Sequence, residues 1–126
     1  MLQIKRVYDP PSPDDGERIL VDRLWPRGLR RAAARIDLWH KELAPSDSLR
    51  RWFHADASRW SDFRRRYRRE LNRHDQVIGD LQRTSAKRTV TFLYAARNTE
   101  RNHAVVLRDF VTGFRRSGAR RASHHE

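Results

Sequence analysis

Hydrophobic and polar positions alternate at the start of the chain, and two later stretches are almost continuously apolar. Residues 2–7 show the period-2 alternation of a strand with one covered face. Residues 17–24 contain an aliphatic run, and residues 89–95 contain a β-branched and aromatic run. Both runs are typical of strands buried within a sheet. The pattern therefore predicts three strands.

The segments between these strands carry apolar residues three and four positions apart, which is the spacing of an amphipathic helix. The longest such stripe follows Ser58 and consists of Trp60, Phe63, Tyr67 and Leu71. Its spacing favours packing against a sheet over stacking on nucleic-acid bases. Residues 37–43 fit either a short helix or an extended segment. Further helices are predicted to begin near Leu29, Ser46, Asp75 and Asn102.

Strands separated by helical segments indicate an α/β fold, with a small and at least partly parallel sheet and helices packed on it. A chain of 126 residues fits a single domain, and the sequence shows no internal repeat or second core. We expect one domain over residues 1–116. Residues 117–126 lack an apolar face, so we expect a disordered basic tail there.

The composition excludes several classes of site. The chain has no cysteine, which excludes disulfides, thiolate metal sites and a cysteine nucleophile. No set of His, Asp and Glu has metal-ligand spacing, so we predict no metal and no other cofactor. The longest apolar runs are about five residues, far below the roughly 20 that span a bilayer. We predict a cytoplasmic protein that does not associate with membranes, and the oligomeric state is left open.

The formal net charge of +12 comes almost entirely from arginine. A solvated Arg-rich surface and a surface that binds polyanions both fit this excess. The densest arginines lie opposite the aromatic stripe and comprise Arg64, Arg65, Arg66, Arg68, Arg69 and Arg73. No DNA- or RNA-reading motif accompanies them, so any binding of nucleic acid would be non-specific.

Charged and aromatic residues follow two of the predicted strands directly. Residues 22–28, Asp-Arg-Leu-Trp-Pro-Arg-Gly, follow one strand, and Tyr94 to Arg97 end another just before a helix start. Parallel strands meet at one edge of a sheet, where α/β proteins bind ligands. Arginines and a helix N-terminus favour a small phosphate or carboxylate there. The predicted binding residues are Tyr8, Arg23, Trp25, Arg27, Gly28, Tyr94, Arg97 and Asn102.

His103 is the one histidine predicted to lie near this pocket. With an unperturbed pKa of about 6.5 it suits a general base, and Asp22 would orient it or tether an arginine. A purely structural hydrogen-bonding role for His103 is the alternative. The candidate catalytic residues are therefore His103 and Asp22. Two hypotheses follow: an enzyme or binder of a small anionic metabolite, and a nucleic-acid-associated or regulatory binding module that uses the basic helix face.

The motifs at these positions resemble a known family. They include Arg6-Val7-Tyr8-Asp9, the stretch from Leu20 to Gly28, Glu42-Leu43-Ala44-Pro45-Ser46, and Leu93 to Arg97 with Asn102-His103-Ala104. Together they are similar to the YeaO-like family, a domain of unknown function numbered 488, over roughly residues 1–112. The resemblance implies a small α/β domain and no established activity.

The wider group that this family resembles often carries a cysteine near the end of the late strand and a Cys-His pair at the next helix start. By that resemblance, Tyr94 stands in place of the first cysteine, and Asn102-His103 stands in place of the pair. Cysteine-dependent chemistry is thereby put in doubt for this chain. His103 and the anion-binding geometry are the features of the wider group's site that this chain would keep.

Overall fold

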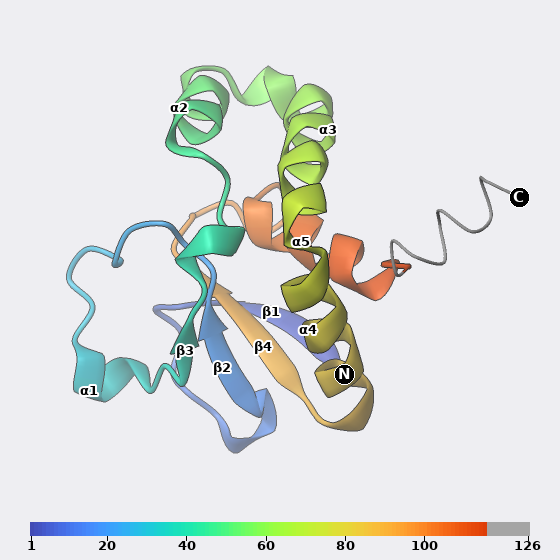
Figure 1. Ribbon diagram of the computed structural model, residues 1–126. Coiled ribbons are helices and arrows are strands. Elements are labelled where there is room, and N and C mark those ends of the chain that lie inside the picture. The colour runs from blue at the N-terminus through green and yellow to red at the C-terminus, as the bar shows by residue number, and fades with distance from the viewer. Residues whose placement is uncertain (116–126) are drawn as a thin grey trace, which may run out of the picture.

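Four parallel strands form one sheet in the computed structural model, which describes residues 1–115 (Figure 1). The strand order is β1-β4-β2-β3. Every residue of the central strand β4 is buried, and β4 pairs in parallel with both β1 and β2. The strands are β1 (Leu2–Arg6), β2 (Glu17–Leu20), β3 (Leu38–Trp39) and β4 (Val90–Tyr94). The prediction of an α/β fold is confirmed, and the tail predicted at 117–126 lies outside the described residues.

Helices cover one face of this sheet. The main core there joins β2 and β4 to the apolar stripes of the helices, and it includes Ile19, Phe92, Phe63 and Leu107. The helices are α1 (Arg31–Ala34), α2 (Asp47–Ala55), α3 (Trp60–Leu71), α4 (Asp75–Lys87) and α5 (His103–Thr112). Short 3-10 turns lie between several of the strands and helices: η1 (Pro13–Asp15), η2 (Lys41–Leu43), η3 (Ala57–Arg59) and η4 (Asn72–His74).

The other face of the sheet has a smaller apolar cluster, built on Leu20 and Leu93. Its cover comes from the segment between β2 and β3, including Trp25 and Leu29, and not from a long helix. Trp25 is held by a hydrogen bond from its indole N–H to the Leu29 carbonyl, at 2.9 Å. The loop after β2 therefore packs as part of the core on this face.

Two predicted elements end earlier than the sequence pattern indicates. The strand predicted over 17–24 ends at Leu20, and only the Val21 N–H adds one more bond to β4, at 3.1 Å to the Leu93 carbonyl. The helix predicted from Leu29 is a single turn, because Arg35 takes a left-handed conformation with φ of 48°. The segment left open at 37–43 contains the two-residue strand β3.

A buried ion pair holds η1 against the sheet. Asp15 and Arg18 are 3% and 4% exposed, and the Arg18 guanidinium donates to the Asp15 carboxylate. Lys5 of β1 donates to both carboxylate oxygens at 3.1 Å, and the Ser12 N–H donates to one at 2.9 Å. Burial alone would raise the pKa of Asp15, but these donors together lower it below its ordinary value.

Replacing Asp15 by Asn is expected to reduce the free energy of unfolding at pH 7 by about 3–5 kcal/mol, because Arg18 loses its buried partner. A carboxyl with a lowered folded-state pKa stabilises the fold above its unfolded-state pKa of about 3.9. That stabilisation is lost as pH falls through the folded-state pKa. The difference between D15N and wild type should therefore shrink between pH 7 and pH 3 in urea unfolding.

The exposed Asp109 supplies the matched control. Asp109→Asn should change the unfolding free energy by no more than about 0.5 kcal/mol. A D15N difference that stays constant down to pH 3 would show that the Asp15 charge does not stabilise the fold.

Candidate functional site

A pocket of about 400 Å³ opens at the carboxyl ends of β2 and β4. The loop after β2 forms one wall, α2 and α3 form another, and the start of α5 forms a third. The apolar part of the lining comprises Leu24, Trp25, Pro26, Pro45, Phe53 and Phe63. The basic part comprises Arg23, Arg27, Arg50, His54 and Arg101. The pocket thus has an apolar wall and a basic rim.

Asp22 and His103 meet within this lining. Oδ2 of Asp22 accepts the Ala95 N–H at 3.1 Å, which joins the end of β2 to the chain leaving β4. Oδ1 of Asp22 lies 2.8 Å from Nε2 of His103, the first residue of α5. The approach is not aligned as a hydrogen bond, and neither buried atom has a hydrogen-bond partner among the described residues. This pair therefore retains unused hydrogen-bonding capacity at the pocket.

Asn102 caps the helix that carries His103. Its Oδ1 accepts the Val105 N–H at 3.0 Å, and its side-chain N–H donates to the Asn98 carbonyl at 2.8 Å. Burial raises the pKa of the neighbouring Tyr94 hydroxyl, and a side-chain hydrogen bond with Asn102 lowers it in part. The cap thus fixes the positive end of the α5 dipole at the pocket.

The arginines of the pocket differ in the hydrogen bonds that hold their guanidinium groups. Arg23 is half-buried, and its guanidinium donates to the carbonyls of Pro45 at 3.1 Å and Ala44 at 3.5 Å. Arg50 donates to Asp47 at 2.7 Å, and its buried Nε has no hydrogen-bond partner in the part of the chain that the structure describes. Partial desolvation, the Arg50 cation and the neighbouring His103 lower the pKa of His54. Arg23 is therefore the arginine of this pocket whose guanidinium is held in place by two backbone carbonyls.

The structure brings six of the ten predicted site residues to the pocket and leaves four outside its lining. Tyr8 donates its hydroxyl to the Arg27 carbonyl at 2.7 Å, and Gly28 forms a turn with φ of 75°. Tyr94 is buried, and Arg97 is exposed. The six that line the pocket are Asp22, Arg23, Trp25, Arg27, Asn102 and His103.

The side chains that α2 and α3 contribute to the site were not predicted from the sequence. Phe63 belongs to the aromatic stripe predicted as core, and it both stacks on Phe53, with ring centroids 4.5 Å apart, and lines the pocket. Arg50 and His54 come from the same helix as Phe53. The helical spacing predicted these helices, but only their packing over the strand ends brings the side chains to the site.

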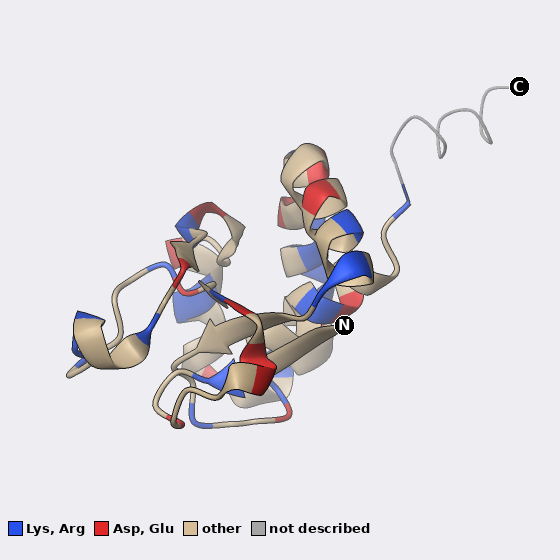
Figure 2. Ribbon diagram, turned by 90° about the horizontal axis from the view of Figure 1, so that it is seen from below, with Lys and Arg blue, Asp and Glu red and all other residues tan. Residues whose placement is uncertain are grey.

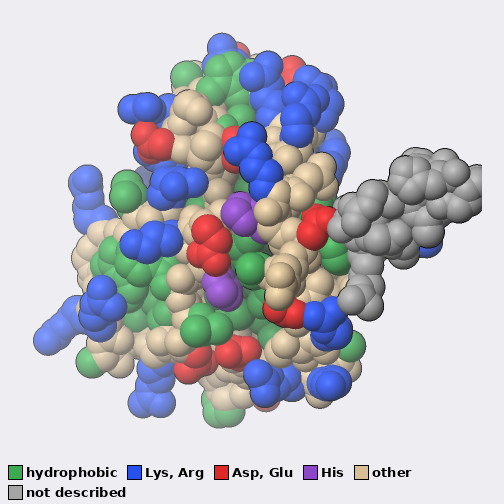
Figure 3. Space-filling model, viewed as in Figure 1, with side chains coloured by type: hydrophobic (Ala, Val, Ile, Leu, Met, Phe, Trp, Pro, Cys, Tyr) green, Lys and Arg blue, Asp and Glu red, His purple; other side chains and the backbone are tan. Residues whose placement is uncertain are grey.

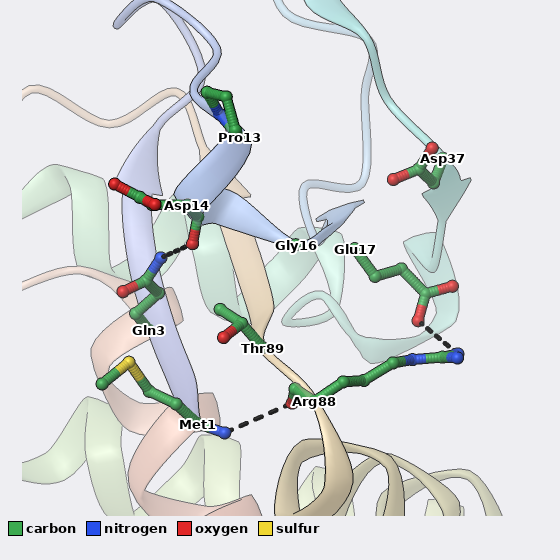
Figure 4. A pocket seen from close by; sticks show the side chains of 9 residues that line it. All are labelled: Met1, Gln3, Pro13, Asp14, Gly16, Glu17, Asp37, Arg88 and Thr89. Atoms are coloured by element: carbon green, nitrogen blue, oxygen red, sulfur yellow. Dashed lines mark hydrogen bonds and ion pairs between the residues drawn. The ribbon is translucent and has the colours of Figure 1, made fainter.

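A second hollow of about 850 Å³ is shallow and lies where the strands begin (Figure 4). Several of its charged groups pair with one another or with backbone: Arg88 contacts Glu17 at 3.4 Å, and the terminal amino group donates to the Arg88 carbonyl at 3.2 Å. Figure 2 shows acidic and basic positions interspersed on this side of the molecule. This hollow therefore offers no concentration of charge of one sign.

Residues 1–115 contain no group of three or more His, Asp or Glu side chains able to hold a metal ion. Within the same range, no helix is both long and apolar enough to cross a bilayer.

Replacing Asn102 by Ala should reduce the free energy of unfolding by about 1 kcal/mol, because the N-cap of α5 is lost. It should also raise the pKa of Tyr94, which Asn102 lowers in the wild type. Chemical denaturation and ultraviolet titration of the tyrosines would measure the two effects. The exposed Asn72, the first residue of η4, is the control, and N72A should leave both quantities nearly unchanged. Equal effects of N102A and N72A would contradict the capping role.

Comparisons with known proteins identify the family of this chain. The family model described as the inactive DUF488-N3 subclade matches residues 1–123. The uncharacterized protein YeaO of Escherichia coli K12 is 46% identical over 110 residues, which cover 87% of this chain and 96% of that protein. The uncharacterized proteins Rv3073c of Mycobacterium tuberculosis and Mb3100c of Mycobacterium bovis are each 40% identical over 113 residues, covering 89% of this chain and 94% of each relative. No solved structure gives a significant match. The chain therefore belongs to the YeaO-like DUF488 family.

Proposed function

We propose that this protein binds a small anionic metabolite in the pocket at the strand ends. The observation that carries the proposal is the Asp22–His103 pair at a pocket of about 400 Å³: its facing atoms lie 2.8 Å apart, and neither has an aligned hydrogen-bond partner within residues 1–115. Buried polar groups without partners in a concave site are satisfied by a ligand or ordered water. A ligand with its own donors and acceptors would supply the missing hydrogen bonds.

The surroundings of the pair indicate the chemical class of the ligand. Arg23, fixed by two backbone carbonyls, and the N-terminus of α5 favour a carboxylate or phosphate group. Trp25, Phe53 and Phe63 provide rings on which an apolar or flat body can pack. The volume suits a molecule of metabolite size. A carboxylate or phosphate on a flat apolar body therefore matches both halves of the lining.

Binding without a covalent intermediate fits the sequence best. The chain has no cysteine to act as nucleophile, and the family model that matches it is described as inactive. Both observations favour recognition of a ligand over cysteine-dependent turnover.

Proton transfer at His103 is the second candidate, favoured by the 2.8 Å approach of Asp22. Because Nε2 faces the carboxylate, Nδ1 is the ring atom left for a substrate. Asp22 would then act as the positioning carboxylate for a general base. This reaction needs no thiol, metal or cofactor.

A ligand panel of aromatic carboxylates, aliphatic carboxylates, sugar phosphates and nucleoside monophosphates would test the main proposal. At least one class should raise the melting temperature of the wild type and bind in calorimetry. Arg23→Gln should weaken that binding tenfold or more, because a charge-assisted hydrogen bond is lost. Arg69→Gln, an exposed change on α3, should leave it unaltered.

Failure of every compound to stabilise the protein, or equal affinity of R23Q and the wild type, would refute the proposed site. His103→Asn separates the two candidates. If His103 transfers protons, H103N binds the ligand and loses its conversion. If the wild type converts none of the compounds, ligand binding without catalysis is the candidate function that remains.

A further inference from the structure

The exposed surface of α3 and of the η3 turn before it is strongly basic, and its arginines do not line the pocket. Seven arginines and two carboxylates occur between residues 59 and 73. Figure 3 shows Lys and Arg side chains gathered over the part of the molecule where Figure 1 places α3. We call the surface formed by Arg59, Arg65, Arg66 and Arg69 the basic ridge.

The two carboxylates of this segment neutralise little of the ridge. Glu70 accepts hydrogen bonds from the backbone N–H and the hydroxyl of Ser46, and so it is committed to the start of α2. Asp62 pairs with Arg65 at 2.7 Å, and both side chains are more than half exposed. Arg59 also lies 3.9 Å from Asp56. Arg66 and Arg69 have no carboxylate within 4.0 Å among residues 1–115, so they carry the unneutralised charge of the ridge.

Trp52 of α2 organises two of these arginines. The guanidinium carbons of Arg66 and Arg59 lie 4.3 and 4.8 Å from the centre of the Trp52 ring. Arg59 also donates to the Trp52 carbonyl at 2.8 Å. Stacking uses the faces of a guanidinium and leaves N–H donors along its edge for bidentate contact with an anion. The ridge is therefore partly preorganised for oxyanions.

The periodicity of the ridge favours a repeating anion. Arg65 and Arg69 are separated by about one helical turn, and α3 with its 12 residues is about 18 Å long. A strand of duplex nucleic acid presents one phosphate per roughly 3.4 Å of axis, so several phosphates fall within that length.

The basic ridge lacks the exposed apolar side chains through which a protein or membrane partner would bind. The exposed large apolar side chains of the described residues are Met1, Tyr8, Leu24 and Leu38, and none belongs to α2 or α3. Protein interfaces depend on buried apolar or aromatic anchors, and interfacial helices insert an apolar face. Trp52 is half-buried and already engaged with two arginines, so it provides no platform for unpaired bases.

We infer that the basic ridge binds the phosphodiester backbone of double-stranded nucleic acid without reading its sequence. The contacts are those of arginine edges with phosphate oxygens, and no base contact is involved. The inference does not depend on the pocket or on its ligand.

The test is fluorescence anisotropy of the full chain with labelled 20-bp DNA and RNA duplexes of mixed sequence across a salt series. The logarithm of the binding constant should fall linearly with the logarithm of salt concentration. The triple variant Arg65→Gln, Arg66→Gln, Arg69→Gln should weaken binding at least tenfold at 100 mM salt. Its salt slope should be smaller by about 3, close to one per lost phosphate contact.

A variant with the same loss of charge elsewhere is the control: Arg83→Gln, Lys87→Gln, Arg88→Gln, all exposed positions in α4 or directly after it. It should retain most of the affinity, as should R23Q. Equal losses of affinity in the two triple variants would show that net charge alone determines binding. That result would overturn the assignment of binding to the basic ridge. Tighter binding of single strands or of polyglutamate than of the duplexes would overturn the duplex assignment, and so would absence of binding at 50 mM salt.

Discussion

The Asp22 carboxylate joins three segments that are distant in sequence, and the pocket depends on this junction. A carboxylate removed from water must receive hydrogen bonds or a nearby cation. Asp22 accepts a backbone N–H from the chain leaving β4 and faces the ring of His103 at the start of α5. Its own carbonyl accepts the indole N–H of Trp39 from β3, at 2.7 Å. The same residue therefore aligns the strand ends and supplies the polar centre of the pocket.

The α2–α3 pair gives the molecule two surfaces of different character. Phe53 and Phe63 stack on the inner side and form part of the apolar wall of the pocket. On the outer side, Trp52 carries the guanidiniums of Arg59 and Arg66. Because both surfaces are built on the same two helices, the packing that closes the pocket also sets the position of the basic ridge.

The elements of the fold could be predicted where burial leaves a pattern in the sequence. The run at 89–95 corresponds to β4, whose residues are all buried, and the stripe containing Phe63 and Tyr67 corresponds to the inner face of α3. β3 has only two residues, too few for a period. The order of the strands depends on pairing between distant segments, so local patterns did not supply it.

The site could be predicted only in part, for a related reason. Asp22, Arg23 and His103 lie next to strand or helix ends, and parallel strands necessarily bring such ends to one edge. Tyr94 and Arg97 follow the same rule, yet one is buried and the other is exposed. Arg50 and Phe53 reach the pocket because α2 packs over the strand ends, which is a tertiary property without a sequence period.

The position of β4 has a consequence for synthesis of the chain. β1 and β2 do not pair with each other, and both form their ladders with a strand that follows α2, α3 and α4. A nascent chain on the ribosome therefore exposes two unpaired strand edges until Val90–Tyr94 has left the exit tunnel. Such long-range parallel pairing is slow to form. The sheet cannot be completed before β4 emerges, so the nascent polypeptide exposes aggregation-prone strand edges up to that point.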